Sequence, residues 1–173
     1  MTASSLATVS LIGMPGVGKS TVGVLLAKHL GLGFVDTDLE IQRREGCTLQ
    51  VLLEAHGFLA LRRIEDQILL GLALEGLVVS TGGSVVYSPE IMARLANAGP
   101  VVYLRADLAT LESRVATAPL RGIASDPQQS YAEVFAERTP LYEGSAAITV
   151  DTVGVAPEQI ALEVATALAH SER

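Results

Sequence analysis

The chain has 173 residues, of which 49% are hydrophobic, and a formal net charge of −7. This size suits one domain with a sizeable core, and we expect residues 1–173 to form it. The acidic balance without a basic cluster argues against nucleic acid as the main partner, and no apolar run is long enough to span a bilayer. Cys47 is the only cysteine, so the simplest expectation is a reduced, cytoplasmic protein without an intrachain disulfide.

The first motif is a glycine-rich segment, GMPGVGKS at residues 13–20, which fits the phosphate-loop pattern G-x-x-x-x-G-K-[ST]. An apolar, β-branched stretch at residues 6–12 precedes it and predicts a buried parallel strand. Residues 22–30 follow with helical spacing of their apolar positions. The alternative is a glycine-rich turn in an unrelated α/β protein, but strand, loop and helix are the context that a phosphate loop requires.

The residue types of this segment suit the phosphates of ATP. Its glycines permit positive φ values and a close approach of backbone to ligand. Its N–H groups, with a helix N-terminus behind them, form a cradle for anions. Lys19 is expected to reach the β- and γ-phosphates, and Ser20 to bind Mg²⁺. The predicted nucleotide contacts of the loop are Gly13, Met14, Pro15, Gly16, Val17, Gly18, Lys19, Ser20 and Thr21.

Two carboxylates follow a second short strand that ends at residues 34–35. Asp36 and Asp38 are two residues apart, so in an extended chain they point to the same side. Both would face the carboxyl edge of the sheet, where open α/β sheets bind ligands. One is expected to help hold Mg²⁺ through water, and the other to orient or deprotonate an acceptor hydroxyl. The alternative is that Asp38 caps the helix predicted to follow it.

The next segments continue the alternation of helices and strands. Arg62 and Arg63 lie in a long helical pattern, where by themselves they could form only a solvated face. Adjacent glycines at 82 and 83 follow a buried strand, and such glycines permit close approach of a ligand or a tight turn. The expected elements are helices at 39–44, 49–55 (capped by Thr48) and 58–74, a strand at 77–80, and a helix at 89–97 that Ser88 caps and Pro89 opens.

The C-terminal half contains the longest predicted loop, residues 118–129, which is rich in Pro, Gly and small residues and carries Arg121 as its only cation. Its length is typical of functional lids, and a lid arginine can stabilise a transferring phosphoryl group. Around it we expect strands at 101–104 and 148–150 and helices at 108–117 (capped by Asp107), 131–142 (interrupted late by Pro140) and from 157 onward. Five strands joined by helical crossovers predict an α/β fold, a three-layer structure with a parallel sheet and helices on both faces.

Taken together, these blocks resemble the shikimate kinase family over nearly the whole chain. The resemblance rests on their identity and order: GMPGVGKSTVG at 13–23, VDTD at 35–38, LRRIE at 61–65, STGGS at 80–84, the lid arginine, ERTPLYEGSA at 137–146 and VDT at 150–152. The phosphate loop alone would name only a superfamily. The resemblance implies a P-loop fold like that of nucleoside monophosphate kinases, with a mobile lid at about 118–129 and an acceptor-binding region at about 38–66.

The resemblance also implies an activity, phosphorylation of the 3-hydroxyl of shikimate by MgATP, and assigns roles to residues. Asp36 corresponds to the aspartate near the metal, and Asp38 to the one that contacts the acceptor hydroxyl and can act as base. Arg62 and Arg138 correspond to the arginines that bind the shikimate carboxylate, a task for which the guanidinium fork is suited. The remaining matches are Gly82 and Gly83 at the acceptor pocket, Arg121 in the lid and Arg114 packed on adenine.

Two departures from the family pattern concern the acceptor and the lid. The family usually has a third glycine where this chain has Ser84, so a Cβ and a hydroxyl are expected in or near the acceptor pocket. The lid usually continues Arg-Pro-Leu, whereas here Gly122 and Ile123 follow Arg121, which should make the lid less rigid.

We therefore expect a monomeric phosphotransferase that acts on a small alcohol bearing a carboxylate, with Lys19, Asp38 and Arg121 as its catalytic residues. Shikimate is the leading acceptor. A smaller hydroxy acid such as homoserine is the alternative, because it would tolerate the bulk of Ser84. A nucleotide-binding regulator without activity is a third hypothesis, and the retained catalytic residues argue against it.

Overall fold

The computed structural model describes residues 7–118 and 122–171, so Arg121 lies outside the described residues. At its centre is a five-stranded sheet with every strand pair parallel, in the order β2-β3-β1-β4-β5. The strands are β1 (Val9–Ile12), β2 (Gly33–Asp36), β3 (Leu77–Ser80), β4 (Val101–Arg105) and β5 (Ile148–Asp151). The central strands are buried on both faces, which explains their nearly continuous apolar sequence.

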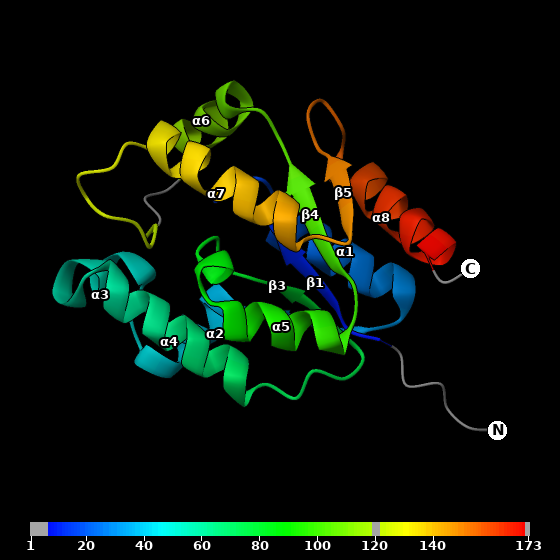
Figure 1. Cartoon of the computed structure of the whole chain (residues 1–173), viewed down its shortest axis with the longest axis horizontal. Helices are drawn as coiled ribbons and strands as arrows, with labels where there is room; N and C mark the ends of the chain where they lie inside the picture. Colours follow the sequence, from blue (N-terminus) through cyan, green and yellow to red (C-terminus); the bar gives the residue numbers. More distant parts are fainter. Residues whose placement is uncertain (1–6, 119–121, 172–173) are drawn as a thin grey trace.

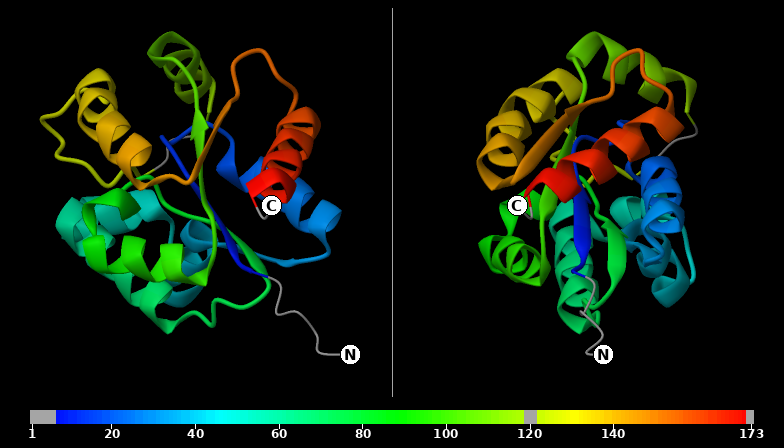
Figure 2. Two further views of the ribbon diagram at one scale, coloured as in Figure 1. Left: turned by 45° about the vertical axis from the view of Figure 1, so that its right-hand side comes forward. Right: turned by 90° about the vertical axis from the view of Figure 1, so that its right-hand side faces the viewer.

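Helices cover both faces of the sheet, so the predicted three-layer α/β fold is confirmed (Figures 1 and 2). α1 (Lys19–Leu30) and α8 (Pro157–Ser171) pack together on one face, while α5 (Pro89–Ala98) and α7 (Tyr131–Ser145) lie on the other. α6 (Leu108–Thr117) contacts α7 beyond the end of β4. In the described residues, no helix is long and apolar enough to cross a membrane.

Three helices form a smaller unit beside the sheet, in the region expected to bind the acceptor. α2 (Thr37–Glu45), α3 (Leu49–His56) and α4 (Phe58–Gly71) enclose a separate apolar cluster. Its buried members are Ile41, Leu52, Leu61 and Ala124. Ala124 belongs to the segment that precedes α7, and Figure 1 shows this yellow segment reaching α3. The predicted lid region thus shares a core with the three helices.

Two predicted helix boundaries and one predicted cap differ from the structure. α2 begins at Thr37, because the carboxylate of Asp36 accepts hydrogen bonds from the N–H groups of Asp38 and Leu39. Asp36, not Asp38, is therefore the cap. Ser88 makes no side-chain capping bond to α5. α7 continues through Pro140 to Ser145.

Two further differences concern segments next to the sheet. α4 ends at Gly71 instead of residue 74, because the backbone of Leu72 is extended. Leu72 and Leu74 still pack on the main core, which is why their pattern mimicked a helix. A short 3₁₀ turn, η1 (Val85–Tyr87), follows β3 and was not predicted.

Candidate active site

The phosphate loop lies between β1 and α1 and has the predicted conformation. Gly13, Gly16 and Gly18 all have positive φ, at 147°, 89° and 104°. A Cβ on Gly13 would lie 2.6 Å from the carbonyl oxygen of Leu104, so the loop can approach β4 only because this residue is glycine. The side chains of Met14 and Val17 are buried in the main core, which leaves the loop to offer its backbone.

Lys19 is buried at the start of α1, with its ammonium group folded over the loop. Its Nζ donates to the carbonyl oxygens of Gly13 at 2.6 Å and Met14 at 3.0 Å. Burial lowers the pKa of Lys19 to about 8, although the carboxylates of Asp38 and Asp36 act in the opposite direction. An anionic ligand at this position would offset the desolvation of the ammonium and favour its charged form.

Ser20 and Asp36 form the pair predicted to hold Mg²⁺. The Ser20 hydroxyl donates to Oδ2 of Asp36, and the other carboxylate oxygen caps α2. This cap fixes the carboxylate beside the phosphate loop. Oxygen donors suit Mg²⁺, which commonly takes few protein ligands together with phosphate oxygens. The described residues contain no group of three or more His, Cys, Asp or Glu able to hold a metal. The hydroxyl of Ser20 and the carboxylate of Asp36 fit a Mg²⁺ ion that is shared with nucleotide phosphates.

A cavity of about 100 Å³ extends from the phosphate loop toward α4 and α7. At one end it is lined by Lys19 and Ser20, and Asp38 borders it from the first turn of α2. The predicted residues that line it are Pro15, Gly16, Gly18, Lys19, Ser20, Thr21, Asp38, Gly82, Gly83, Ser84 and Arg138. The cavity volume is smaller than the roughly 300–1,000 Å³ typical of small-molecule sites. The segment at Gly122, Ile123 and Ala124 forms part of its wall.

Arg62 and Arg138, which are 76 positions apart in the sequence, converge on one oxygen atom. The carbonyl oxygen of Ala124 accepts from Nε and Nη2 of Arg62, at 3.2 and 3.0 Å, and from Nη2 of Arg138 at 2.8 Å. The ring of Tyr87 lies 4.0 and 5.3 Å from the two guanidinium carbons. Burial and the adjacent Arg138 cation lower the pKa of Arg62. Two like charges around one acceptor form a place suited to a carboxylate.

Glu65 is a site residue that sequence reasoning missed. It lies on the buried stripe of α4, one turn after Leu61, and lines the same cavity. Its Oε2 accepts from the hydroxyl of Ser84 at 2.7 Å. The expected hydroxyl of Ser84 is therefore present at the cavity, but it is turned toward Glu65. The available signal was the spacing of Leu61, Glu65 and Leu69, which places an acid on an otherwise apolar helix face.

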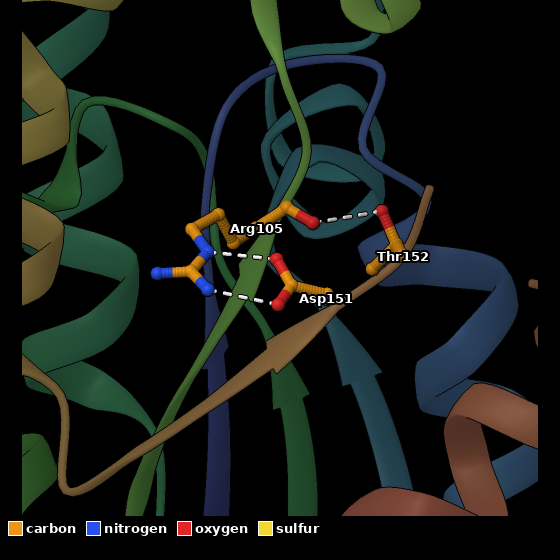
Figure 3. Close-up of polar contacts among 3 residues, drawn as sticks. All are labelled: Arg105, Asp151 and Thr152. Carbon is orange, nitrogen blue, oxygen red and sulfur yellow. Dashed lines mark hydrogen bonds and ion pairs between the residues drawn. The ribbon is translucent and has the colours of Figure 1, made fainter. Parts of the chain in front are cut away.

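The opposite end of the phosphate loop contains the residues expected near adenine. Arg114, on α6, donates to the carbonyl oxygens of Val17 and Thr152, both at 3.2 Å. It therefore ties the phosphate loop to the segment after β5. Figure 3 shows how that segment is fixed: Arg105 and Asp151 make two hydrogen bonds, at 2.7 and 2.8 Å, and Thr152 donates to the Arg105 carbonyl at 3.0 Å.

Similarity to known proteins shows the family to which this chain belongs. The model of the family described as "SKI: Shikimate kinase" matches residues 15–169. The chain belongs to the shikimate kinase family. The shikimate kinase of Nitrosospira multiformis is 38% identical over 95% of this chain and 86% of that relative. That of Thiobacillus denitrificans is 39% identical over 82% of this chain and 79% of that relative.

A solved structure agrees with the computed fold. The shikimate kinase from Acinetobacter baumannii in complex with shikimate superposes with a TM-score of 0.86 at 30% identity, covering 96% of this chain and 94% of that one. The resemblance predicted from the motifs is thus confirmed. A shikimate kinase is an ATP-using phosphotransferase with an alcohol acceptor, and that reaction class applies to this chain.

Proposed function

We propose that this protein transfers the γ-phosphoryl group of ATP to the 3-hydroxyl of shikimate, forming ADP and 3-phosphoshikimate for aromatic amino acid biosynthesis. The observation that carries the acceptor assignment is the convergence of Arg62 and Arg138 on the carbonyl oxygen of Ala124. An acceptor carboxylate would take the place of that oxygen. The phosphate loop lines the same cavity as Arg138, and this supports the donor assignment.

The chain's own residues supply positioning and charge. The loop N–H groups and Lys19 would hold the β- and γ-phosphates, with Ser20 and Asp36 as the ligands for Mg²⁺. When bound, Mg²⁺ supplies neutralisation of the phosphate charge. Arg62 and Arg138 would anchor the acceptor through its carboxylate, so that its hydroxyl lies between Asp38 and the γ-phosphate. Most of the acceleration would come from this alignment and from preorganised charge.

Asp38 is the proposed base for the transfer. The acceptor oxygen forms a bond to phosphorus as the bond to the ADP oxygen breaks, and the hydroxyl proton passes to the Asp38 carboxylate. Arg121, which lies outside the described residues, is proposed from the family resemblance to close over the phosphates. The space for the acceptor is bordered by Gly82, Gly83 and Ser84. Arg114 is proposed to lie against the adenine. We keep a monomer as its expected oligomeric state and the cytoplasm as its expected location.

Homoserine remains the alternative acceptor, but its main support has weakened. This alternative rests on the bulk of Ser84, and the Ser84 hydroxyl is held by Glu65. The deciding experiment is turnover of shikimate and of homoserine under identical MgATP conditions, measured by ADP release. Turnover of shikimate at least a hundredfold faster supports the proposal; preference for homoserine, or no turnover of shikimate, overturns it.

The same assay separates an enzyme from a nucleotide-binding regulator. Asp38→Asn should reduce phosphoryl transfer by at least a hundredfold while leaving the Kd for ATP within about threefold. Gln42→Ala, one turn further along α2, is the matched control and should retain activity. A wild-type protein that binds ATP but turns over neither acceptor would favour the regulator.

A further inference from the structure

The carboxyl group of Glu65 occupies an unusual place for an acid. α4 buries one face of the helix, at Leu61, Glu65 and Leu69, and Glu65 is only 4% exposed. An ionised carboxylate is costly to bury unless hydrogen bonds compensate for the lost water. The position of Glu65 therefore calls for partners on both of its oxygens.

Its two oxygens are not equivalent. Oε2 accepts from the Ser84 hydroxyl at 2.7 Å, whereas Oε1 is buried and has no hydrogen-bond partner in the described part of the chain. Oε1 lies against Gly82, where a Cβ would come within 2.1 Å of it. Glu65, Gly82 and Ser84 all line the cavity proposed to receive the acceptor.

The charged groups around Glu65 come from several elements. Asp38 on α2 and Asp66 on its own helix are acidic. The basic groups are Arg138 on α7, Lys19 on α1 and Arg62 on its own helix. Burial, reinforced by Asp38, raises the pKa of Glu65 to about 7, and the hydrogen bond from Ser84 opposes this rise. Near pH 7 the Glu65 carboxyl therefore exists in both its protonated and its ionised form, and removal of the Ser84 hydroxyl should change its pKa.

We propose that Ser84 is a positioning residue: its hydroxyl holds one oxygen of Glu65 so that the other accepts a hydrogen bond from a hydroxyl of the bound acceptor. This rests on the proposed function and deepens it, because it requires an acceptor with a hydroxyl besides the one that is phosphorylated. Glycine, the residue usual at this place in the family, has no hydroxyl and cannot hold Glu65 in this way.

The first test is the kinetics of Ser84→Ala with shikimate as acceptor. Its KM for shikimate should rise about tenfold, the size expected for loss of a hydrogen bond to a charged group, with the KM for MgATP within twofold. Ser84→Thr, which keeps the hydroxyl, should restore most of the loss. Ser10→Ala is the matched control, because Ser10 is also buried but its hydroxyl has no partner among the described residues.

Substrate analogues identify the hydroxyl concerned. For a shikimate analogue that lacks the hydroxyl contacted by Glu65, wild type and Ser84→Ala should have the same KM within twofold. For an analogue that lacks the other non-phosphorylated hydroxyl, the tenfold difference in KM between wild type and Ser84→Ala should persist. Glu65→Gln should raise the KM for shikimate like Ser84→Ala and serves as the second variant if Ser84→Ala does not fold. A KM within twofold of wild type for both variants overturns the proposal.

A titration without acceptor separates this inference from the proposed function. The side-chain carboxyl of Glu65 is followed by ¹³C NMR against pH in wild type and Ser84→Ala. A midpoint at higher pH in the variant supports the contact, and an unchanged midpoint overturns it. Failure of wild type to turn over shikimate would instead overturn the proposed function, and then this titration still decides whether Ser84 holds Glu65.

Discussion

Replacing Glu65 by glutamine should stabilise the protein at neutral pH and not at acid pH. Burial and Asp38 raise the pKa of Glu65 from its ordinary value of 4.5 to about 7. Between these values the folded protein retains a proton that the unfolded chain releases, so the stability of the wild type falls as pH rises through this window. At about 1.4 kcal/mol per pKa unit, the loss amounts to about 3 kcal/mol.

Glutamine keeps the shape of the side chain and carries no charge at any pH. The stability of Glu65→Gln relative to wild type should therefore rise by about 3 kcal/mol from pH 4.5 to pH 7.5 and stay constant above it. Urea denaturation at four pH values measures this, since the slope for a small protein is about 1–3 kcal/mol per molar. The midpoint of the variant should move by about 1–3 M relative to wild type across the range.

The exposed Glu75 provides the control. Glu75→Gln removes the same charge from a solvated position, so its stability relative to wild type should change little with pH. An equal stability gap between Glu65→Gln and wild type at pH 4.5 and at pH 7.5 would refute the reasoning, because it would mean that Glu65 titrates alike in the folded and unfolded chains.

Three other changes test the lid contact, the carboxylate site and the phosphate loop. Gly122→Ala places a Cβ 2.6 Å from the backbone at the start of α3. Hydrogen exchange of the backbone amides at residues 122–126 should therefore accelerate about tenfold. Gly144→Ala is the control and should not accelerate this exchange, because a Cβ at Gly144 has no atom within 4 Å. Arg62→Ala should raise the KM for shikimate about 10- to 100-fold, and the exposed Arg63→Ala less than twofold. For wild type, kcat/KM for MgATP should fall above pH 8 as Lys19 loses its proton.

For each of these three predictions, one experimental result would contradict it. Unchanged exchange in Gly122→Ala would mean that the segment does not pack on α3 in solution. Equal rises in the KM for ATP and for shikimate would make Arg62 a structural residue. A kcat/KM for MgATP that stays level from pH 7.5 to pH 9.5 would mean that Lys19 keeps an ordinary pKa.

Most of the fold could be predicted because its signals are local. The buried strands are short apolar runs that end at glycines, polar residues or prolines. The phosphate-loop motif predicts the turn between β1 and α1. The errors at helix ends arose where two residues competed for one role. Asp36 and Asp38 are both good caps, and only the geometry at the end of β2 selects Asp36. Leu72 and Leu74 continue an apolar pattern, although they pack on the core from an extended segment.

The site was predictable only where a motif carries it. The phosphate loop and the two aspartates follow from residue types and spacing, whereas Arg62 and Arg138 needed the family resemblance to be linked. Nothing in the sequence indicates that the backbone carbonyl of Ala124 lies between them. Ala124 is 62 positions from Arg62, and the contact uses its backbone and not its side chain. The role of Glu65 depends on Ser84, 19 positions away.

The two main departures from the family pattern each have a local partner in the structure. Ser84 introduces a hydroxyl and places it on Glu65. Gly122 removes a side chain at a place where any Cβ would meet the backbone of Leu49. One lies at the end of β3 and the other in the lid region, and both border the same cavity. The position that Arg62 and Arg138 share holds the carbonyl oxygen of Ala124 and no atom of Ser84 or Gly122. The two departures therefore change the walls of the cavity, and the two arginines that suit a carboxylate are retained.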